Sequence, residues 1–243
     1  MTSATWDRTE RMLERKEADG ELDWVDGEPQ FGGRHVIRED SDIDGGVYLG
    51  SGEREAIVVD SENYGEVDRM YEKARDKASD SSGNVNKNFA LQAAYEVAVE
   101  EFTPSESEMD RLVDMYGDIT DHDIESEQDM RDEAYLSGKI AEHYGVENDG
   151  KIGLDVFSEE GVGVCRHRAL AAGAIIEKFQ EDGILTGEVS VDRNSRGKYG
   201  HAWVRYENSG GNVFVIDPMQ EKIKALEETE DDFWDYERPE DNI

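Results

Sequence analysis

The sequence predicts an α+β fold in which the N-terminal half is mostly helical and the C-terminal half holds a helix followed by antiparallel strands. Two observations lead to this prediction. Apolar residues recur at the spacing of a helix face through the middle of the chain. After residue 186 the pattern changes to short stretches of β-forming residues separated by turn residues. Because helices and strands occupy separate parts of the chain, the pattern favours α+β over an alternating α/β arrangement.

Helical patterns dominate the N-terminal half, where only 46–49 and 56–59 have the composition of short strands. The helix faces are centred on 67–78, 91–102, 105–115 and 130–144. Ser105 and Glu108 match the pattern of a capping box, which predicts a helix start at that point. The polar stretch 120–129 is expected to be a loop.

The C-terminal half begins with a predicted helix over 164–182, which Gly183 ends. Its buried stripe is Ala169, Ala172, Ile176 and Phe179. Three strands are then expected, at 187–191, 201–206 and 212–216. The last two are joined by Glu-Asn-Ser-Gly-Gly, a strong hairpin pattern.

Composition divides the chain into four segments. They are a weakly structured acidic segment 1–34, a mixed but mainly helical region 35–150, a core 151–226 and an acidic C-terminal tail 227–243. The first segment has room for one short charged helix near its start. The tail contains Phe233, Trp234 and Tyr236, so it either docks on the core through these rings or is exposed.

The charge of the chain is extreme, with 60 acidic and 26 basic residues and a formal net charge of −34. Such a surface repels itself in dilute buffer, whereas about 1 M salt shortens the screening length to roughly 3 Å and removes most of the repulsion. We therefore expect a protein adapted to a high-salt cytoplasm. Nucleic-acid binding is not expected, because a phosphate backbone needs a basic face. The other interpretation is a partly disordered acidic protein.

Several classes of protein are disfavoured by the residues that the chain lacks. There is no apolar run of membrane length, and the start MTSATWDRTE lacks a signal-peptide pattern, so neither a membrane partner nor export is expected. One cysteine excludes an internal disulfide and a multi-cysteine zinc site. His35, His122 and His143 lie in acidic surroundings without metal-ligand spacing, so no metal and no cofactor are expected.

The stretch GVGVCRHRAL places the single cysteine, Cys165, at the predicted start of a helix. A helix N-terminus and nearby cations both lower the pKa of a thiol from about 8.5 and so favour the nucleophilic thiolate. Arg166, His167 and Arg168 bring positive charge to the first turn, although the helix dipole disfavours cations there. The arginines are easier to explain if they hold an acidic partner or a substrate. A buried structural cysteine is the alternative.

A thiolate enzyme also needs a base and a group that orients the base. His201 in GHAWVRY and Asp217 in NVFVIDP supply these residue types. If the hairpin loop is Asn208–Gly210, His201 lies directly opposite Asp217 on one face of the sheet, with Cβ atoms roughly 5 Å apart. A four-residue loop would shift the register by one and place the two side chains on opposite faces, and a bulge could do the same.

These three motifs, in this order, resemble the transglutaminase-like superfamily over residues 152–219, and the Cys-Arg-His-Arg-Ala string is similar to one branch of it. The resemblance implies a cysteine-proteinase-like α+β core, with a cysteine-bearing helix packed on an antiparallel sheet that carries His and Asp. It implies that Cys165 is the nucleophile, His201 the general base and acid, and Asp217 the residue that orients His201. No upstream glutamine and no calcium loop matches the animal cross-linking enzymes.

Other residues are expected to support this site or to bind substrate, namely Gly163, Arg166, His167, Tyr199 and Trp203. His167 is a rival base, but a side chain two positions along a helix points away from Cys165. Trp203 is expected to pack near the site and Tyr199 to shape the cleft. The backbone N–H of Cys165 is the default oxyanion donor.

The leading functional hypothesis is thiol-dependent acyl transfer on a protein, peptide or amide substrate, with hydrolysis as the simpler outcome. Transfer to an amine would make the chain a cross-linking enzyme. A catalytically inactive binding or assembly module on the same fold is the hypothesis from a different class, and a disordered acidic chaperone-like protein is the third. The sequence leaves the oligomeric state open.

Overall fold

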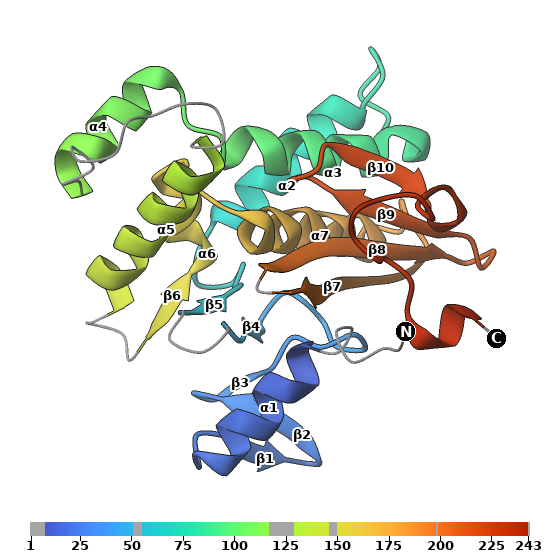
Figure 1. Cartoon of the computed structure of the whole chain (residues 1–243). Helices are drawn as coiled ribbons and strands as arrows, with labels where there is room; N and C mark the ends of the chain where they lie inside the picture. Colours follow the sequence, from blue (N-terminus) through green and yellow to red (C-terminus); the bar gives the residue numbers. More distant parts are fainter. Residues whose placement is uncertain (1–7, 51–54, 117–128, 146–149, 198, 243) are drawn as a thin grey trace.

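The computed structural model describes residues 8–50, 55–116, 129–145, 150–197 and 199–242. Within these residues the chain is a mixed α/β protein with seven α-helices and three β-sheets (Figure 1). The predicted loop at 120–129 lies outside the described residues except for its last position. None of the helices in the described ranges is long and apolar enough to cross a membrane.

The largest sheet is antiparallel, and its strand order is β10-β9-β8-β7. Its strands are β7 (Gly187–Arg196), β8 (Tyr199–Asn208), β9 (Val213–Asp217) and β10 (Lys222–Ala225). The three strands predicted for this part of the chain are confirmed. Strand β10 is an addition, since its four residues are too few and too charged to stand out as a strand in the sequence.

Helix α7 (Cys165–Glu181) packs against β7, β8 and β9. On β8 the side chains of Ala202, Val204 and Tyr206 enter the main hydrophobic core, which also contains the apolar residues of α7. Trp203 and Val215 belong to a separate apolar cluster. Side chains therefore alternate between the two faces of the sheet, with one face packed on α7 and the other covered by a different segment.

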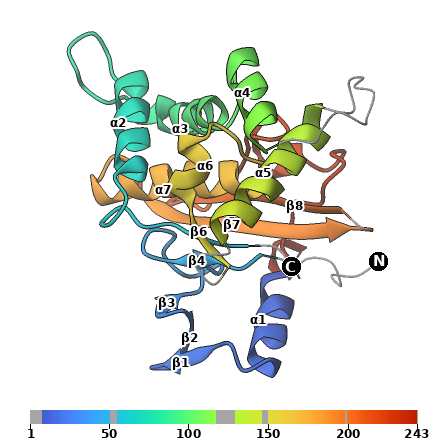
Figure 2. The ribbon, with the colours of Figure 1, turned by 90° about the vertical axis from the view of Figure 1, so that its left-hand side faces the viewer.

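Helices α2 (Glu66–Ala78) and α3 (Lys87–Glu101) pack against each other and against α7. Figure 2 shows α7 lying between these helices and strands β7 and β8. The predicted face of α2 is buried at every position: Val67, Met70, Tyr71, Ala74 and Ala78. Helix α4 (Glu106–Tyr116) begins at the predicted capping box, where the backbone N–H of Ser105 donates to Glu108 over 2.8 Å. Helices α5 (Asp129–Gly145) and α6 (Leu154–Glu159) follow.

A second sheet joins distant parts of the chain. It consists of β4 (Val47–Tyr48), β5 (Ala56–Val58) and β6 (Lys151–Gly153), and β5 pairs with β6 in parallel. The first two strands are the ones that composition predicts, whereas β6 is too short to be found by its pattern. Because this pairing ties the N-terminal region to the segment just before α7, the start of α7 is anchored to β5 as well as to the large sheet.

Residues 8–35 contain more regular structure than their composition suggests. They form α1 (Arg8–Ala18) and a three-stranded sheet of β1 (Asp23–Val25), β2 (Glu28–Phe31) and β3 (Arg34–His35). The short charged helix expected near the start is present as α1, whereas the expectation that segment 1–34 is otherwise weakly structured is wrong for residues 8–34. The reason is a small apolar cluster that composition does not reveal, in which Met12 and Leu13 pack with Val36, Leu49 and Val58.

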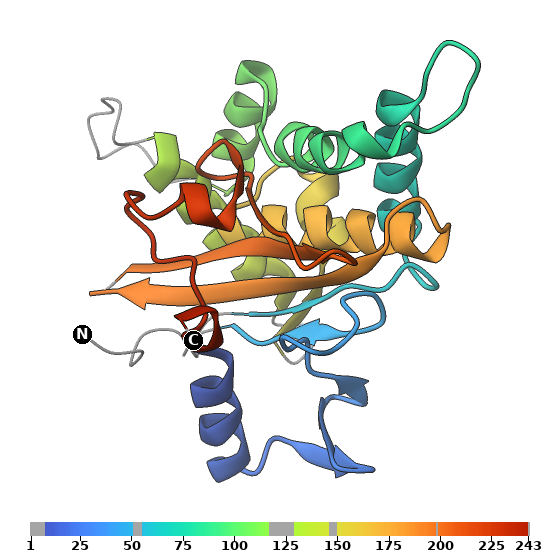
Figure 3. The same ribbon diagram turned by 90° about the vertical axis from the view of Figure 1, so that its right-hand side faces the viewer.

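The C-terminal tail docks on the large sheet, which decides between the two alternatives that the sequence left open. It contains two short 3₁₀ helices, η1 (Leu226–Glu228) and η2 (Pro239–Asn242). Between them, Trp234 and Tyr236 are buried against the outer face of the sheet, whereas Phe233 is 57% exposed. In Figure 3 the tail, coloured red, lies across the large sheet. We call residues 229–241 the C-terminal segment.

Candidate active site

Cys165 is the first residue of α7, and its side chain is half-buried. The backbone that leads into this helix passes through Gly163, which is tightly surrounded by neighbouring side chains. A Cβ on Gly163 would lie 2.5 Å from Cδ1 of Phe102 and 2.9 Å from Cβ of His167, so no larger residue fits without a shift. The extended backbone of Val164 then leads into the helix. The sulfur therefore sits at the positive end of the helix dipole.

His201 and Asp217 form a buried hydrogen-bonded pair across β8 and β9. Nε2 of His201 donates to Oδ2 of Asp217 over 2.5 Å. The other carboxylate oxygen, Oδ1, accepts from the backbone N–H groups of Met219 at 3.1 Å and Gln220 at 3.0 Å. Because Asp217 is completely buried, these donors replace the water that its charge would otherwise need.

The register of the hairpin differs from the prediction. Glu207 pairs with Val213 and Val204 with Ile216, so the three-residue loop is 209–211 and the predicted loop Asn208–Gly210 is wrong by one position. The shift arises because Gly211 takes the positive φ of +79° that the end of such a loop requires. His201 and Asp217 therefore share a face as diagonal neighbours, and they are not directly opposite as predicted.

Cys165 and His201 complete a row of three groups. Nε2 of His201 is bonded to Asp217, and the thiol of Cys165 lies close enough to the same imidazole for each group to shift the pKa of the other. Burial opposes the charge on His201, but the hydrogen bonds to Asp217 and Cys165 outweigh burial and raise the pKa of His201 from 6.5 to about 9. The imidazole therefore carries a proton at neutral pH.

The thiol of Cys165 shifts in the opposite direction. Burial alone would raise its pKa, but the hydrogen bond and charge of His201, the charge of Arg166 and the backbone N–H of Ala202 together lower it. A lowered thiol pKa beside a raised imidazole pKa favours a thiolate–imidazolium pair. Such a pair is the reactive form of a cysteine nucleophile.

Arg166 finds an acidic partner within the chain. It is buried and donates through Nε to Oε1 of Glu55 over 3.0 Å, and its Nη2 donates to the same oxygen. Burial would raise the pKa of Glu55, but contacts with His167 and Arg166 outweigh burial and lower it to about 2. The ionised Glu55 thereby balances the cation that the helix dipole disfavours.

His167 has a supporting role. Its ring is completely buried and lies 4.0 Å from the ring of Phe157, centroid to centroid. Nδ1 accepts a hydrogen bond of 3.0 Å from the backbone N–H of Val164, and Nε2 faces Oε1 of Glu55 at 3.7 Å, which is longer than a normal hydrogen bond. Burial and the charge of Arg166 lower the pKa of His167 to about 4, so its ring is neutral and caps the helix.

The two remaining predicted residues lie on the same face of β8 as His201. Trp203 is completely buried, and its ring centroid is 6.0 Å from that of His201. Tyr199 is 59% exposed and pairs with Arg196 at the end of the β7–β8 hairpin. Trp203 is thus part of the packing beneath the site, whereas Tyr199 is exposed at the end of the hairpin.

Two aromatic residues of the site were not among those predicted for it, and both come from the C-terminal segment. The ring of Trp234 stacks on that of His201, with centroids 4.7 Å apart and planes inclined by 18°. The hydroxyl of Tyr236 donates to Oδ2 of Asp217 over 2.7 Å. The only indication of either in the sequence is the aromatic cluster Phe-Trp-Asp-Tyr within an otherwise acidic tail.

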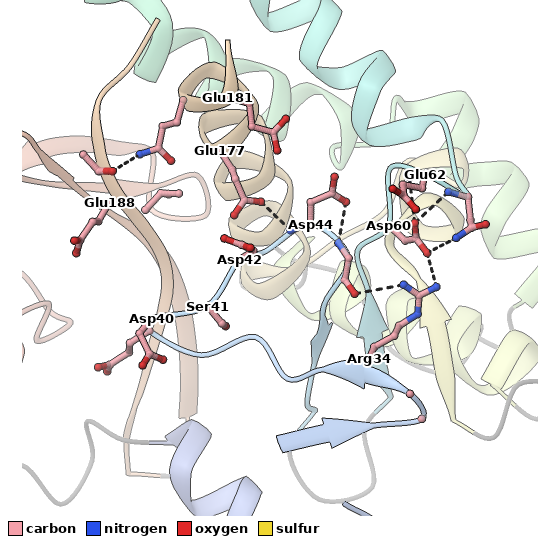
Figure 4. Close-up of a pocket in the computed structure, with 18 residues that line it drawn as sticks. Arg34, Asp40, Ser41, Asp42, Asp44, Asp60, Glu62, Glu177, Glu181 and Glu188 are labelled. Atoms are coloured by element: carbon pink, nitrogen blue, oxygen red, sulfur yellow. Dashed lines mark hydrogen bonds and ion pairs between the residues drawn. The ribbon is translucent and has the colours of Figure 1, made fainter. Parts of the chain in front are cut away.

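A separate hollow of about 1060 Å³ lies between α7, β7 and the loop before β4. Figure 4 shows that carboxylates dominate its lining, among them Asp44, Asp60 and Glu177. Glu177 accepts from the backbone N–H groups of Ile43 at 2.9 Å and Asp44 at 2.8 Å. Burial is the main cause that raises the pKa of Glu177 to about 7. None of Cys165, His201 and Asp217 lines this hollow.

In the described residues no group of three or more His, Cys, Asp or Glu side chains could hold a metal ion. Comparison of the chain with models of known protein families, with curated proteins and with solved structures finds no match.

Proposed function

We propose that this chain is a thiol-dependent acyl-transfer enzyme, in the simplest case a hydrolase of amide or peptide bonds. The observation that supports the proposal is the row of Cys165, His201 and Asp217, in which the thiol lies at a helix N-terminus beside His201 and its pKa is lowered. Burial, charge partners and mutual geometry together distinguish this row from a cysteine that only fills space.

The row supplies each group that the reaction needs. The Cys165 thiolate attacks the carbonyl carbon, and the carbonyl π electrons move to oxygen as the C–S bond forms. When the tetrahedral intermediate collapses, the C–N bond breaks and the imidazolium of His201 protonates the leaving amine. His201 then takes a proton from water, which attacks the thioester, and the acid leaves as the thiol is restored. Asp217 orients His201 throughout.

The resemblance to the transglutaminase-like superfamily adds to this proposal. That resemblance implies the order Cys, His, Asp along the chain. It also implies a cysteine at a helix N-terminus, with the histidine and the aspartate on adjacent antiparallel strands. Membership of the transglutaminase-like superfamily is therefore part of this proposal, together with the reaction. A high-salt cytoplasm is the proposed setting, supported by the net charge of −34.

The test is to label Cys165 with a thiol-directed, peptide-based electrophile in molar KCl and to measure release of amines from a peptide library. Wild type should be labelled and should turn over at least one library member. Cys165→Ala should do neither while unfolding cooperatively. Addition of a primary amine distinguishes the outcomes, because a hydrolase releases acid and a cross-linking enzyme forms a new amide. A labelled protein that turns over nothing would favour the inactive binding module.

A further inference from the structure

The C-terminal segment lies across the outer face of the large sheet (Figure 3), where it contacts both β7 and β8. At its start, the guanidinium of Arg196 lies 4.4 Å from the ring centroid of Phe233. In the middle, Nδ2 of Asn194 donates to the backbone carbonyl of Asp235 over 2.5 Å. Further along, Arg238 pairs with Asp192 at 2.7 Å. The segment is therefore attached to the sheet on both sides of Trp234 and Tyr236.

Trp234 covers the imidazole of His201. The two rings are stacked, and Trp234 itself is 8% exposed. Asn194 lies opposite His201 on β7 and holds the backbone next to Trp234. The indole thus closes the solvent side of the hydrogen bond between His201 and Asp217, and a shielded hydrogen bond to a charged group is stronger than one open to water.

Tyr236 acts on the other member of the pair. Its hydroxyl donates to Oδ2 of Asp217, the same oxygen that accepts from His201. The Tyr236 ring packs edge-on against Trp203, with centroids 4.9 Å apart, which fixes the direction of the hydroxyl. Asp217 therefore has four donors, two on each oxygen, and one carboxylate position satisfies them all.

We propose that the C-terminal segment is a structural part of the catalytic site, in which Trp234 shields His201 and Tyr236 orients Asp217. Both are positioning residues, since neither is required to touch a substrate. This inference rests on the proposed function for its catalytic meaning. The physical claim concerns only the protonation of His201 and Cys165.

The charges around this cluster come from four elements. Helix α7 contributes Cys165 and Arg166, β9 contributes Asp217, and the C-terminal segment contributes Tyr236 and the nearby Asp232. Strand β7 contributes the buried Asp192, which is paired with Arg238. The tyrosine is held neutral, because burial and the charge of Asp217 raise its pKa. Replacing Trp234 or Tyr236 with a neutral residue therefore changes shielding and hydrogen bonding without adding a new charge.

The test uses the full chain in molar KCl and the rate at which iodoacetamide alkylates Cys165, the single thiol, as a function of pH. We expect a thiolate plateau and then a second rise near pH 9, where the imidazolium of His201 loses its proton. Trp234→Leu should move this rise down toward pH 6.5 by at least about one unit, because exposure weakens every perturbation of a buried group.

Tyr236→Phe should move the second rise in the opposite direction, by roughly half a pH unit, which is about a threefold change in the acid constant. The reason is that Oδ2 of Asp217 then accepts a hydrogen bond from His201 alone and stabilises the imidazolium more strongly. Trp234→Phe retains a stacking ring and should restore the profile to within a few tenths of a unit. Glu230→Gln is the control, because Glu230 is exposed in the same segment and its charge is screened in molar KCl, and it should leave the profile unchanged.

The inference is overturned if Trp234→Leu and Tyr236→Phe, shown to be folded by near-ultraviolet circular dichroism, give the wild-type profile. Should Trp234→Leu fail to fold, Tyr236→Phe carries the test, since it removes a single oxygen. Amine release separates this result from the proposed function. If both variants shift the profile but no amine is released, the proposed enzymatic activity is refuted and the positioning role stands. If amine is released but neither variant shifts the profile, only the positioning role is refuted.

Discussion

Arg166 and Glu55 form a buried ion pair that joins the first turn of α7 to the residue before β5. The two positions are 111 residues apart in the chain. The pair places the charge of Arg166 next to the helix start that carries Cys165, and Arg166 contributes to the lowered pKa of that thiol. The ion pair therefore connects the stability of the fold with the reactivity of the site.

Removing one member of this pair should be costly. Glu55→Ala leaves the guanidinium of Arg166 buried without a counter-charge, and we expect a loss of about 3–5 kcal/mol in the free energy of unfolding. The double variant Glu55→Ala with Arg166→Met should recover much of that loss, because no buried charge remains. Denaturant unfolding in molar KCl measures both. Glu159→Ala, an exposed glutamate, is the control, and an equal cost for Glu55→Ala and Glu159→Ala would refute the role of the pair.

Gly163 should tolerate no side chain. The methyl group of Gly163→Ala would meet Phe102 at 2.5 Å, and overpacking of this kind costs about 1–3 kcal/mol. Phe102→Leu should relieve part of the clash, so the double variant should be more stable than the sum of the single changes predicts. Unfolding free energies of the four proteins form the cycle. Strict additivity would show that the contact with Phe102 is not what excludes a side chain at position 163.

The carboxylate of Asp217 should set the pH range of the site. Its hydrogen bond is a main cause of the raised pKa of His201, so Asp217→Asn should move the deprotonation of His201 from about pH 9 toward 6.5. Amide cleavage needs the imidazolium to protonate the leaving amine, and activity in the variant should therefore disappear at a lower pH than in wild type. A pH series of amine release measures this shift. An unchanged basic limb would mean that Asp217 does not tune His201.

Glu177 should make stability depend on pH. Its pKa is raised from 4.5 to about 7 in the folded chain, so the folded state favours the protonated carboxyl group. The stability that this preference provides is fully present below pH 4.5 and is lost as the pH rises through 7. Between about pH 5 and about pH 8, wild type should lose stability relative to Glu177→Gln. Unfolding in molar KCl at several pH values gives the slope. Glu181→Gln, an exposed carboxylate of the same helix, should follow wild type, and a Glu177→Gln slope equal to that of wild type would contradict the account.

The parts of the fold that the sequence predicts are those with a local pattern. The α2 face, the capping box at Ser105 and strands β7, β8 and β9 of the large sheet all follow from spacing within one element. The strand β6 does not, because three residues that pair in parallel with a distant strand leave no periodic trace. The cluster under α1 escapes prediction for a similar reason, since its members are apolar residues scattered over several short elements.

The site shows the same division. Cys165, His201 and Asp217 each belong to a local motif, and the structure brings them together, although the hairpin register is displaced by one loop position. Glu55 and Tyr236 have no such motif. Each reaches the site through a long-range contact, with Arg166 or with Asp217, and the residue types alone do not indicate it.

The most direct test of the account is the ionisation of Cys165 in the folded protein. The ultraviolet absorbance of the thiolate, measured against Cys165→Ser in molar KCl, follows this group alone because the chain has one cysteine. The account predicts a midpoint below about 8.5, the ordinary value of a thiol, which rises when His201 is replaced by Gln. A midpoint at or above about 8.5 in wild type, unmoved by His201→Gln, would contradict the thiolate–imidazolium pair and with it the proposed chemistry.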